Sequence, residues 1–216
     1  MEDDGPIVLR LEVSSGGEPV TGVVCAPDGG THQFIGWSEL FAVLAKVVLP
    51  GQAPAWSWEE QAAGARPLLE ALLPEAARLG VRLAVEPVSQ LRMDLGFLHT
   101  FADALDFVDA LGSPWCGVVL EVNNAWIERG LYANIRDRTD RIAVVQVNDF
   151  KVGTLRANER VVIGDGDIPL RRICHALADA GYDGWYDIEL LGPAIDAEGY
   201  ASVVPRAVAA FRALWT

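Results

Sequence analysis

Four predicted strands of this chain end in a side chain that offers an oxygen atom at a similar depth. They are Glu86 in LAVEP, Glu121 in VVLEV, Gln146 in VVQV and Glu189 in DIEL. If the strands run parallel, their carboxyl ends meet at one edge of the sheet and these side chains converge there. Each glutamate alone is most simply an exposed strand-end residue, but four oxygen ligands at matching strand ends favour a functional site.

Binding of a divalent metal ion is the chemistry that such a cluster suits. Three carboxylates around one spot, without a lysine nearby, would repel one another strongly, and a bound cation would relieve that repulsion. The set consists of oxygen ligands only, which fits Mg²⁺ or Mn²⁺ better than Zn²⁺. We therefore expect one divalent metal ion, Mn²⁺ or Mg²⁺, as the cofactor.

The elements that would position this site alternate between strand and helix from residue 45 onward. Predicted strands cover residues 45–51, 81–87, 116–122, 142–147 and 185–190. Predicted helices cover residues 57–80, 97–111, 168–180 and 199–214, with helical turns around 128–138. The strands are continuous apolar runs, as in sheets covered on both faces, and right-handed crossovers would pair them in parallel. This pattern predicts an α/β fold, either a doubly wound sheet or a (β/α) barrel.

The loop before the helix at 168–180 ends in the sequence GDGDI, which reads as a tight turn followed by a helix start. Asp167 is placed to cap that helix, and Pro169 fits its first turn. No glycine-rich phosphate motif follows the first strand, which disfavours a dinucleotide-binding fold.

The N-terminal part does not follow the alternation. Residues 7–13 and 22–26 read as strands with no room for a helix between them, and residues 27–38 read as a loop. Seven strands are therefore predicted where a closed barrel needs eight.

These features predict one domain, residues 1–216, with an irregular part at 1–44 and regular βα units at 45–216. Either an N-terminal βα unit is missing, or residues 1–38 close the barrel irregularly. An open barrel leaves unpaired strand edges, which a second subunit could cover, so we expect a homodimer as a possible assembly.

Composition excludes several classes of partner. The 216-residue chain carries 17 lysines and arginines against 30 acidic residues, a net charge of −13. Such a surface disfavours nucleic acids and anionic membranes, and no apolar run approaches the length of a membrane span. The three cysteines are far apart and odd in number, which is typical of reduced thiols, and the acidic start MEDDGP is unlike a signal peptide. We therefore expect a cytoplasmic protein.

Several segments, taken in order, resemble the sugar phosphate isomerase/epimerase family, whose members are xylose isomerase-like TIM barrels. They are LAVEP, VVLEVNNAW, RIAVVQVNDF, GDGDI and AGYDGWYDIEL, and the resemblance covers about residues 45–215. It implies a (β/α) TIM-type barrel and an enzyme that isomerises or epimerises a small ketose or hydroxy-ketone. In that family four strand-end residues bind one divalent metal ion, and the first and last also move the proton. By position these are Glu86, Glu121, Gln146 and Glu189.

The resemblance also implies substrate contacts. The substrate-binding arginine of the family corresponds to Arg160. Asp149 follows Gln146 at a spacing that the family uses, so it could orient the loop or the metal shell, and a loop cap is equally plausible. Asn124 stands where the family usually has a histidine, and Trp126 could form the wall of a sugar site or simply pack in the core.

Three departures from the family keep a non-catalytic alternative open. Glu121 replaces the usual aspartate, Asn124 replaces the usual histidine, and the short N-terminal part leaves seven predicted strands instead of eight. The alternative is a catalytically inactive barrel that binds a sugar or a partner protein. A third reading, the related metal-dependent DNA-repair endonucleases, requires several histidine ligands and a basic groove, which this sequence lacks.

Overall fold

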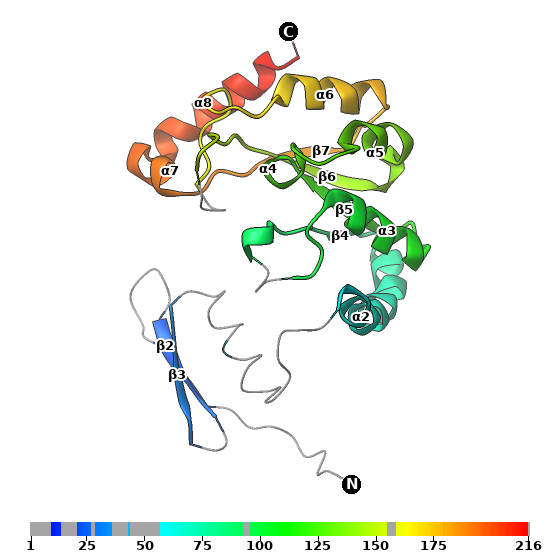
Figure 1. Ribbon diagram of the computed structural model, residues 1–216, viewed down its shortest axis with the longest axis vertical. Coiled ribbons are helices and arrows are strands. Elements are labelled where there is room, and N and C mark those ends of the chain that lie inside the picture. The colour runs from blue at the N-terminus through cyan, green and yellow to red at the C-terminus, as the bar shows by residue number, and fades with distance from the viewer. Residues whose placement is uncertain are drawn as a thin grey trace. The chain divides into compact units, whose positions relative to one another are not determined.

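The structure is a computed structural model of the chain, and it describes residues 10–13, 21–26, 29–35, 43, 57–92, 96–154 and 159–215. The chain forms two compact units, Met1–Ser57 and Trp58–Thr216, whose elements are drawn in Figure 1. The strand predicted at 45–51 lies outside the described residues.

The first unit contains an antiparallel sheet in the order β1-β2-β3. Its strands are β1 (Arg10–Val13), β2 (Thr21–Cys25) and β3 (Thr31–Ile35). The strand predicted at 22–26 is confirmed within one residue, and the strand predicted at 7–13 is confirmed over its described residues 10–13, but the predicted loop at 27–38 is wrong where β3 forms. Phe34 is the one buried side chain among those described in β3, so the hydrophobic pattern of this strand is weak and backbone pairing with β2 holds it.

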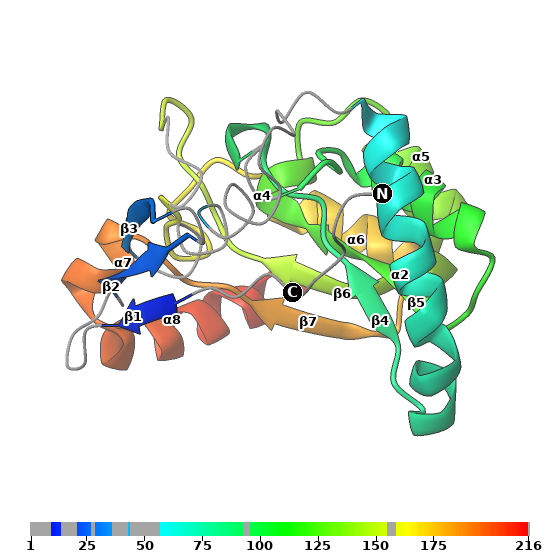
Figure 2. The same ribbon diagram turned by 90° about the horizontal axis from the view of Figure 1, so that it is seen from below.

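The second unit contains a parallel sheet in the order β4-β5-β6-β7 (Figure 2). Its strands are β4 (Leu83–Val85), β5 (Cys116–Glu121), β6 (Ile142–Val147) and β7 (Trp185–Ile188). All three pairings are parallel, as the sequence predicted. Each successive strand lies beside the previous one, which is the arrangement of consecutive βα units.

Helices cover one face of this sheet. They are α2 (Trp58–Leu79), α3 (Phe101–Leu111), α4 (Val122–Ala125), α5 (Leu131–Asp137), α6 (Leu170–Asp179), α7 (Pro193–Glu198) and α8 (Tyr200–Ala213). Figure 1 shows α8, α6, α5, α3 and α2 in an arc around the strands. Within the described ranges, none of the helices combines the length and the apolar character needed to cross a membrane.

Side chains alternate between the two faces of the sheet. Val118 and Leu120 of β5 and Val145 and Val147 of β6 are fully buried in the core on the helix side. The residues between them point to the other face, where Trp185 of β7 is 83% exposed. That second face is the one that carries Glu121 and Gln146, so the sheet separates an apolar core from the candidate site.

Two helices begin later than the sequence indicated. The structure starts α3 at Phe101 rather than at residue 97, because the Thr100 hydroxyl caps it by accepting from the backbone of Asp103. The structure starts α6 at Leu170, and the expected cap by Asp167 is wrong. The Asp167 carboxylate instead accepts a hydrogen bond from the backbone of Val152, in the loop after β6.

Candidate active site

The register of the sheet places the strand-end residues on one face. Glu121 of β5 pairs with Gln146 of β6, and Gln146 pairs with Asp187 of β7. Because side chains alternate along a strand, Glu189 lies on the same face as Asp187, and Glu86 directly follows β4 on the face that also carries Glu121. The described sheet thus places these strand-end residues on one face, and their convergence into one ligand set stays a prediction.

Glu121 is the most deeply buried member of the set, with no exposed surface. Its Oε1 accepts hydrogen bonds from the backbone N–H of Asn123 at 3.0 Å and from the Nδ2 of Asn148 at 2.7 Å. The first bond caps the short helix α4, which begins directly after β5. Its Oε2 has no hydrogen-bond donor among the described residues. Two donors therefore fix one oxygen of this carboxylate, and the other oxygen is left as a free acceptor.

Arg160 joins two of the predicted ligands. Its Nη2 lies 2.8 Å from Oε2 of Glu189 and 3.4 Å from Oε1 of Glu121. The residue is only 6% exposed, so these contacts are largely shielded from water. An ion pair in such surroundings is much stronger than one at the surface. Arg160 thus lies inside the cluster that the sequence assigned to the metal.

The pKa values of two glutamates reflect this setting. Burial raises the pKa of Glu121 to about 7, against the lowering effects of Arg160, Asn148 and the backbone of Asn123. Burial also raises the pKa of Glu86, and repulsion from Glu189 and Asp187 adds to it, while Arg160 opposes it. Both groups therefore exchange protons closer to neutral pH than an ordinary glutamate does.

Asp149 organises the loop that delivers Arg160. Its carboxylate, only 1% exposed, accepts four backbone hydrogen bonds. The donors are Phe150 and Ile168 to Oδ1, at 2.9 and 3.1 Å, and Gly164 and Gly166 to Oδ2, at 2.9 and 3.0 Å. These bonds assign Asp149 the loop-ordering role. A direct substrate contact, which was also expected, would have to replace one of them.

Gly166 is tightly constrained by this carboxylate. A Cβ atom built on Gly166 would lie 2.1 Å from Oδ1 of Asp149 and 2.6 Å from the backbone nitrogen of Phe150. No side chain fits in that space, so the loop closes around Asp149 only with a glycine at this position. Gly164, with φ of +92°, makes the preceding turn.

Gln146 is half-buried beside Asp187. Its Nε2 is 3.4 Å from Oδ2 of Asp187, a long contact, and its Oε1 lacks a hydrogen-bond donor within the described part of the chain. Its oxygen is therefore an acceptor that a ligand could use, and its predicted role as a metal ligand stays a prediction.

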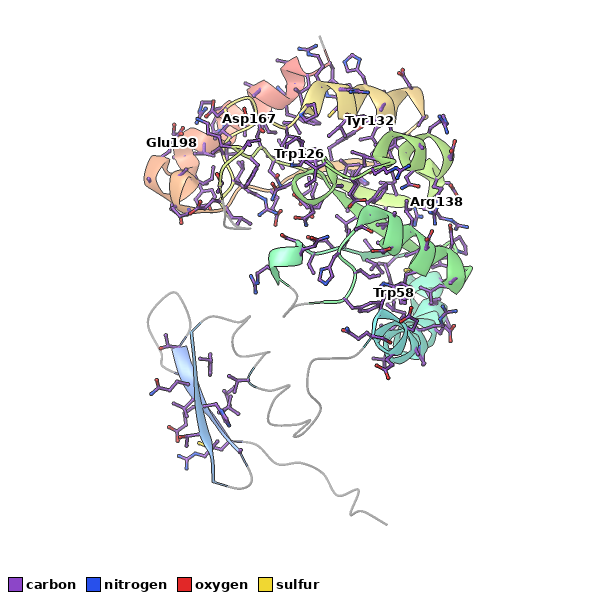
Figure 3. All side chains as sticks on the ribbon, in the orientation of Figure 1. Trp58, Trp126, Tyr132, Arg138, Asp167 and Glu198 are labelled. Atoms are coloured by element: carbon purple, nitrogen blue, oxygen red, sulfur yellow. The ribbon has the colours of Figure 1, made fainter. Side chains whose placement is uncertain are left out.

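Asn124 and Trp126 belong to the segment that directly follows Glu121, in α4 and at its end. The Nδ2 of Asn124 donates to the backbone oxygen of Pro87, which ties the start of α4 to the segment directly after Glu86. Trp126 follows α4, as Figure 3 shows, and packs partly against the core. Both residues, together with Phe150, line a cavity of about 590 Å³. The cavity is lined by none of the four predicted metal ligands, so the predicted contact of Asn124 and Trp126 with a sugar stays a prediction.

The residues fit an oxygen-bound metal ion in their chemistry. In the described ranges, no three histidine, cysteine, aspartate or glutamate side chains lie close enough together to hold a metal ion. Arg160 contributes to this separation of the acidic side chains, because its guanidinium lies between Glu121 and Glu189. However, Oε2 of Glu121 and Oε1 of Gln146 are buried acceptors that find no donor among the described residues, which is unusual for protein interiors and suits a hard cation.

Sequence reasoning assigned no role to two residues of this cluster. Asn148 binds Glu121, and Asp187 lies beside Gln146 and affects the pKa of Glu86. The period of two along a strand could have found both, because Asn148 is two residues from Gln146 and Asp187 is two residues from Glu189.

Comparisons with known proteins agree with this architecture. The family model described as xylose isomerase-like TIM barrel matches residues 32–209. L-ribulose-5-phosphate 3-epimerase UlaE from Escherichia coli O157:H7 is 29% identical over 117 residues, which are 53% of this chain and 38% of that enzyme. The chain thus spans well under two thirds of the length of this curated relative.

Two solved structures share the fold. Protein SMc04130 from Sinorhizobium meliloti 1021 has a TM-score of 0.63 and 27% identity, over 69% of this chain and 56% of that one. The IolI protein, solved with a bound zinc atom, has a TM-score of 0.65 and 21% identity, over 74% of this chain and 58% of that one.

Proposed function

Because this chain belongs to the xylose isomerase-like TIM barrel family, we propose that it is a metal-dependent isomerase or epimerase of a small ketose or hydroxy-ketone. The observation that carries the proposal is the ion-paired cluster of Glu121, Arg160 and Glu189 at the carboxyl ends of the parallel strands. This is the face on which barrel enzymes build their active sites. The likeness to an L-ribulose-5-phosphate 3-epimerase supports this reaction class.

Four residues would hold the metal ion, Mn²⁺ or Mg²⁺. They are Glu86, Glu121, Gln146 and Glu189. The ion would supply a positive charge that polarises the substrate carbonyl and stabilises the enediolate. IolI, a protein with the same fold, was solved with a bound zinc atom, which supports metal binding by this fold, and the all-oxygen donor set favours Mn²⁺ or Mg²⁺.

Glu86 and Glu189 would transfer the proton at the carbon beside the carbonyl. One carboxylate removes it and the other returns a proton to the opposite face of the same carbon, which inverts that carbon. Return to the former carbonyl carbon, with the hydroxyl proton passing to the former carbonyl oxygen, would move the carbonyl instead. The raised pKa of Glu86 suits this role, because a carboxyl group that titrates nearer to neutral pH can both accept and donate at physiological pH. The partly exposed side chain of Glu189 leaves it within reach of a substrate.

Arg160 would bind a substrate oxygen. Its guanidinium is held at the site by Glu189 and is delivered by the loop that Asp149 orders. Asn124 and Trp126 would contact the far end of the substrate through the cavity that they line. The homodimer, the single domain over residues 1–216 and the cytoplasmic location remain predictions of the sequence.

The proposal is tested by metal binding followed by exchange of substrate protons with solvent. Mn²⁺ is titrated calorimetrically into EDTA-treated protein, beside a Glu121→Ala variant. A panel of free and phosphorylated ketopentoses and ketohexoses is then incubated with the Mn²⁺-loaded protein in D₂O. We expect stoichiometric binding that the variant loses, and deuterium at one carbon beside the carbonyl. A well-folded protein that binds no Mn²⁺ would refute the metal-dependent enzyme.

One observation favours a second candidate, a catalytically inactive barrel that binds a sugar or a partner protein. Arg160 pairs with two glutamates and offsets part of their negative charge, so a metal ion is not the sole partner available to them. This candidate predicts that a sugar binds but takes up no deuterium. The same incubation in D₂O measures the uptake of deuterium.

A further inference from the structure

Asn148 is a buried amide for which the sequence suggested no function. It follows β6 directly, and none of its surface is exposed. Its Nδ2 donates to Oε1 of Glu121 at 2.7 Å, a short distance for a bond between an amide and a carboxylate. The nitrogen has to face Glu121, because an amide oxygen in its place would repel the carboxylate.

This bond makes the two oxygens of Glu121 different from each other. Oε1 is held by Asn148, by the backbone of Asn123 and, at 3.4 Å, by Arg160. Oε2 has no donor among the residues that the structure describes. These contacts oppose rotation of the carboxylate, which leaves Oε2 as the oxygen available to a ligand.

A purely structural role explains Asn148 poorly. Amides that only bridge two elements normally satisfy both the nitrogen and the oxygen, because an unpaired buried polar atom is costly. Oδ1 of Asn148 is buried and lacks a donor among the described residues, as do Oε2 of Glu121 and Oε1 of Gln146. Three acceptors without donors lie on neighbouring strand ends, which points to a shared positive partner.

We propose that Asn148 is a positioning residue that fixes Glu121 so that Oε2 is presented to the divalent cation. The inference rests on the proposed function. The side chain of glutamate has one more rotatable bond than that of aspartate, so Glu121 would lose more conformational freedom on binding a cation. The bond from Asn148 restricts that freedom before the cation binds. Partners of metal ligands of this kind typically contribute 10-fold to 100-fold to metal affinity.

The test is the Mn²⁺ dissociation constant, measured by calorimetry on EDTA-treated protein. Asn148→Leu removes the donor at nearly constant volume, and we expect it to weaken Mn²⁺ binding about 10-fold to 100-fold. Val147→Ala is the matched control, because Val147 is the neighbouring buried residue and faces the helices. It should lower the unfolding midpoint and leave the dissociation constant unchanged. If Asn148→Leu does not fold, Asn148→Ser is measured in its place.

A double-mutant cycle separates positioning from a general effect on the fold. In a Glu121→Asp background the shortened carboxylate no longer reaches Asn148, so Asn148→Leu should change Mn²⁺ affinity less than about threefold. Equal losses in both backgrounds, or unchanged affinity in Asn148→Leu alone, would overturn the role of Asn148 and leave the proposed function intact. Absence of Mn²⁺ binding by the unsubstituted protein would overturn both.

Discussion

Nη2 of Arg160 lies 2.8 Å from Oε2 of Glu189, in the shortest ion pair of the candidate site. The arginine side chain is 7% exposed and that of Glu189 is 28% exposed, so the pair lies at the boundary between the protein interior and the open side of the site. The same guanidinium is 3.4 Å from Glu121. Arg160 therefore offsets part of the charge of two predicted metal ligands, and it must influence how strongly they attract another cation.

We expect Arg160→Met to raise Mn²⁺ affinity about tenfold while abolishing turnover. Two unit charges 4 Å apart interact by about 4 kcal/mol at an effective dielectric constant of 20, so removing the guanidinium strengthens the hold of Glu121 and Glu189 on a cation even after solvent screening. Turnover is lost because the substrate oxygen loses its donor. Calorimetric titration at pH 8, where Glu121 is ionised, measures the affinity.

Arg206→Met is the control for this substitution. Arg206 forms exposed ion pairs with Asp165 and Glu198, away from the strand ends, and its loss should leave Mn²⁺ affinity unchanged. If Arg160→Met bound Mn²⁺ no more tightly than the unsubstituted protein, the idea that the guanidinium opposes the metal charge would be wrong.

Glu189→Gln should keep the fold and lose the proton transfer. The amide preserves the size of the side chain but cannot act as a base, and a general base typically contributes 10²-fold to 10⁴-fold to the rate. Deuterium incorporation into the ketose found by the D₂O screen should fall by that factor, with an unchanged circular dichroism spectrum. Asp183→Asn is the matched control, because Asp183 is exposed in the segment before β7, and it should retain most of the exchange. Full activity in Glu189→Gln would remove Glu189 from the mechanism.

Mn²⁺ binding should depend on pH through Glu121. Its pKa is about 7 in the folded protein, and the metal requires the ionised carboxylate, so affinity should fall about tenfold per pH unit below 7 and level off above it. Titrations in buffers of different ionisation enthalpy should show about one proton released per Mn²⁺ at pH 6. A dissociation constant that is flat between pH 5.5 and 7 would contradict the raised pKa.

The same pKa determines how the stability of the metal-free protein depends on pH. Native Glu121 holds its proton up to about pH 7, whereas in the unfolded chain the proton leaves near the ordinary value of 4.5. Between these values the native state binds more protons, so the free energy of unfolding decreases as the pH rises from 4.5 to 7. Urea titrations should show this slope, and Glu121→Gln should reduce it.

The sequence predicted the strands and strand ends that follow a repeated pattern. Strands β5 and β6 are continuous apolar runs, and matching strand ends predict that Glu121 and Gln146 converge, which agrees with their pairing in the sheet. The sequence did not predict β3, because Phe34 is the one buried side chain among those described there. β3 forms because its backbone pairs with that of β2. Backbone pairing does not depend on apolar side chains, so it leaves no hydrophobic pattern in the sequence.

Contacts between distant segments could not be predicted from the sequence. The GDGDI turn was recognised, but its purpose depends on Asp149, whose carboxylate fits only because Gly166 lacks a side chain. The contact of Asn148 with Glu121 joins two strands and could not be inferred from either strand alone. The expected cap by Asp167 failed for the same reason, because a backbone N–H outside the helix competes for its carboxylate.

Asp149→Asn should destabilise the protein by about 3 kcal/mol. The carboxylate accepts four backbone hydrogen bonds, two on each oxygen, and the amide nitrogen of asparagine would face two N–H groups that it cannot accept. Urea unfolding measures the loss. Hydrogen exchange should accelerate at Gly164 and Gly166, and the looser loop should weaken the pairing of Arg160 with Glu189.

Asp165→Asn tests whether this effect belongs to Asp149 or to the loop in general. Asp165 lies between Gly164 and Gly166 in the same turn, but its side chain is 47% exposed and pairs with Arg206 at the surface. Exposed pairs contribute little, so this variant should unfold within error of the unsubstituted protein. If both variants were equally unstable, the loop would depend on its total negative charge, and the four-bond arrangement around Asp149 would not be what holds Arg160 in place.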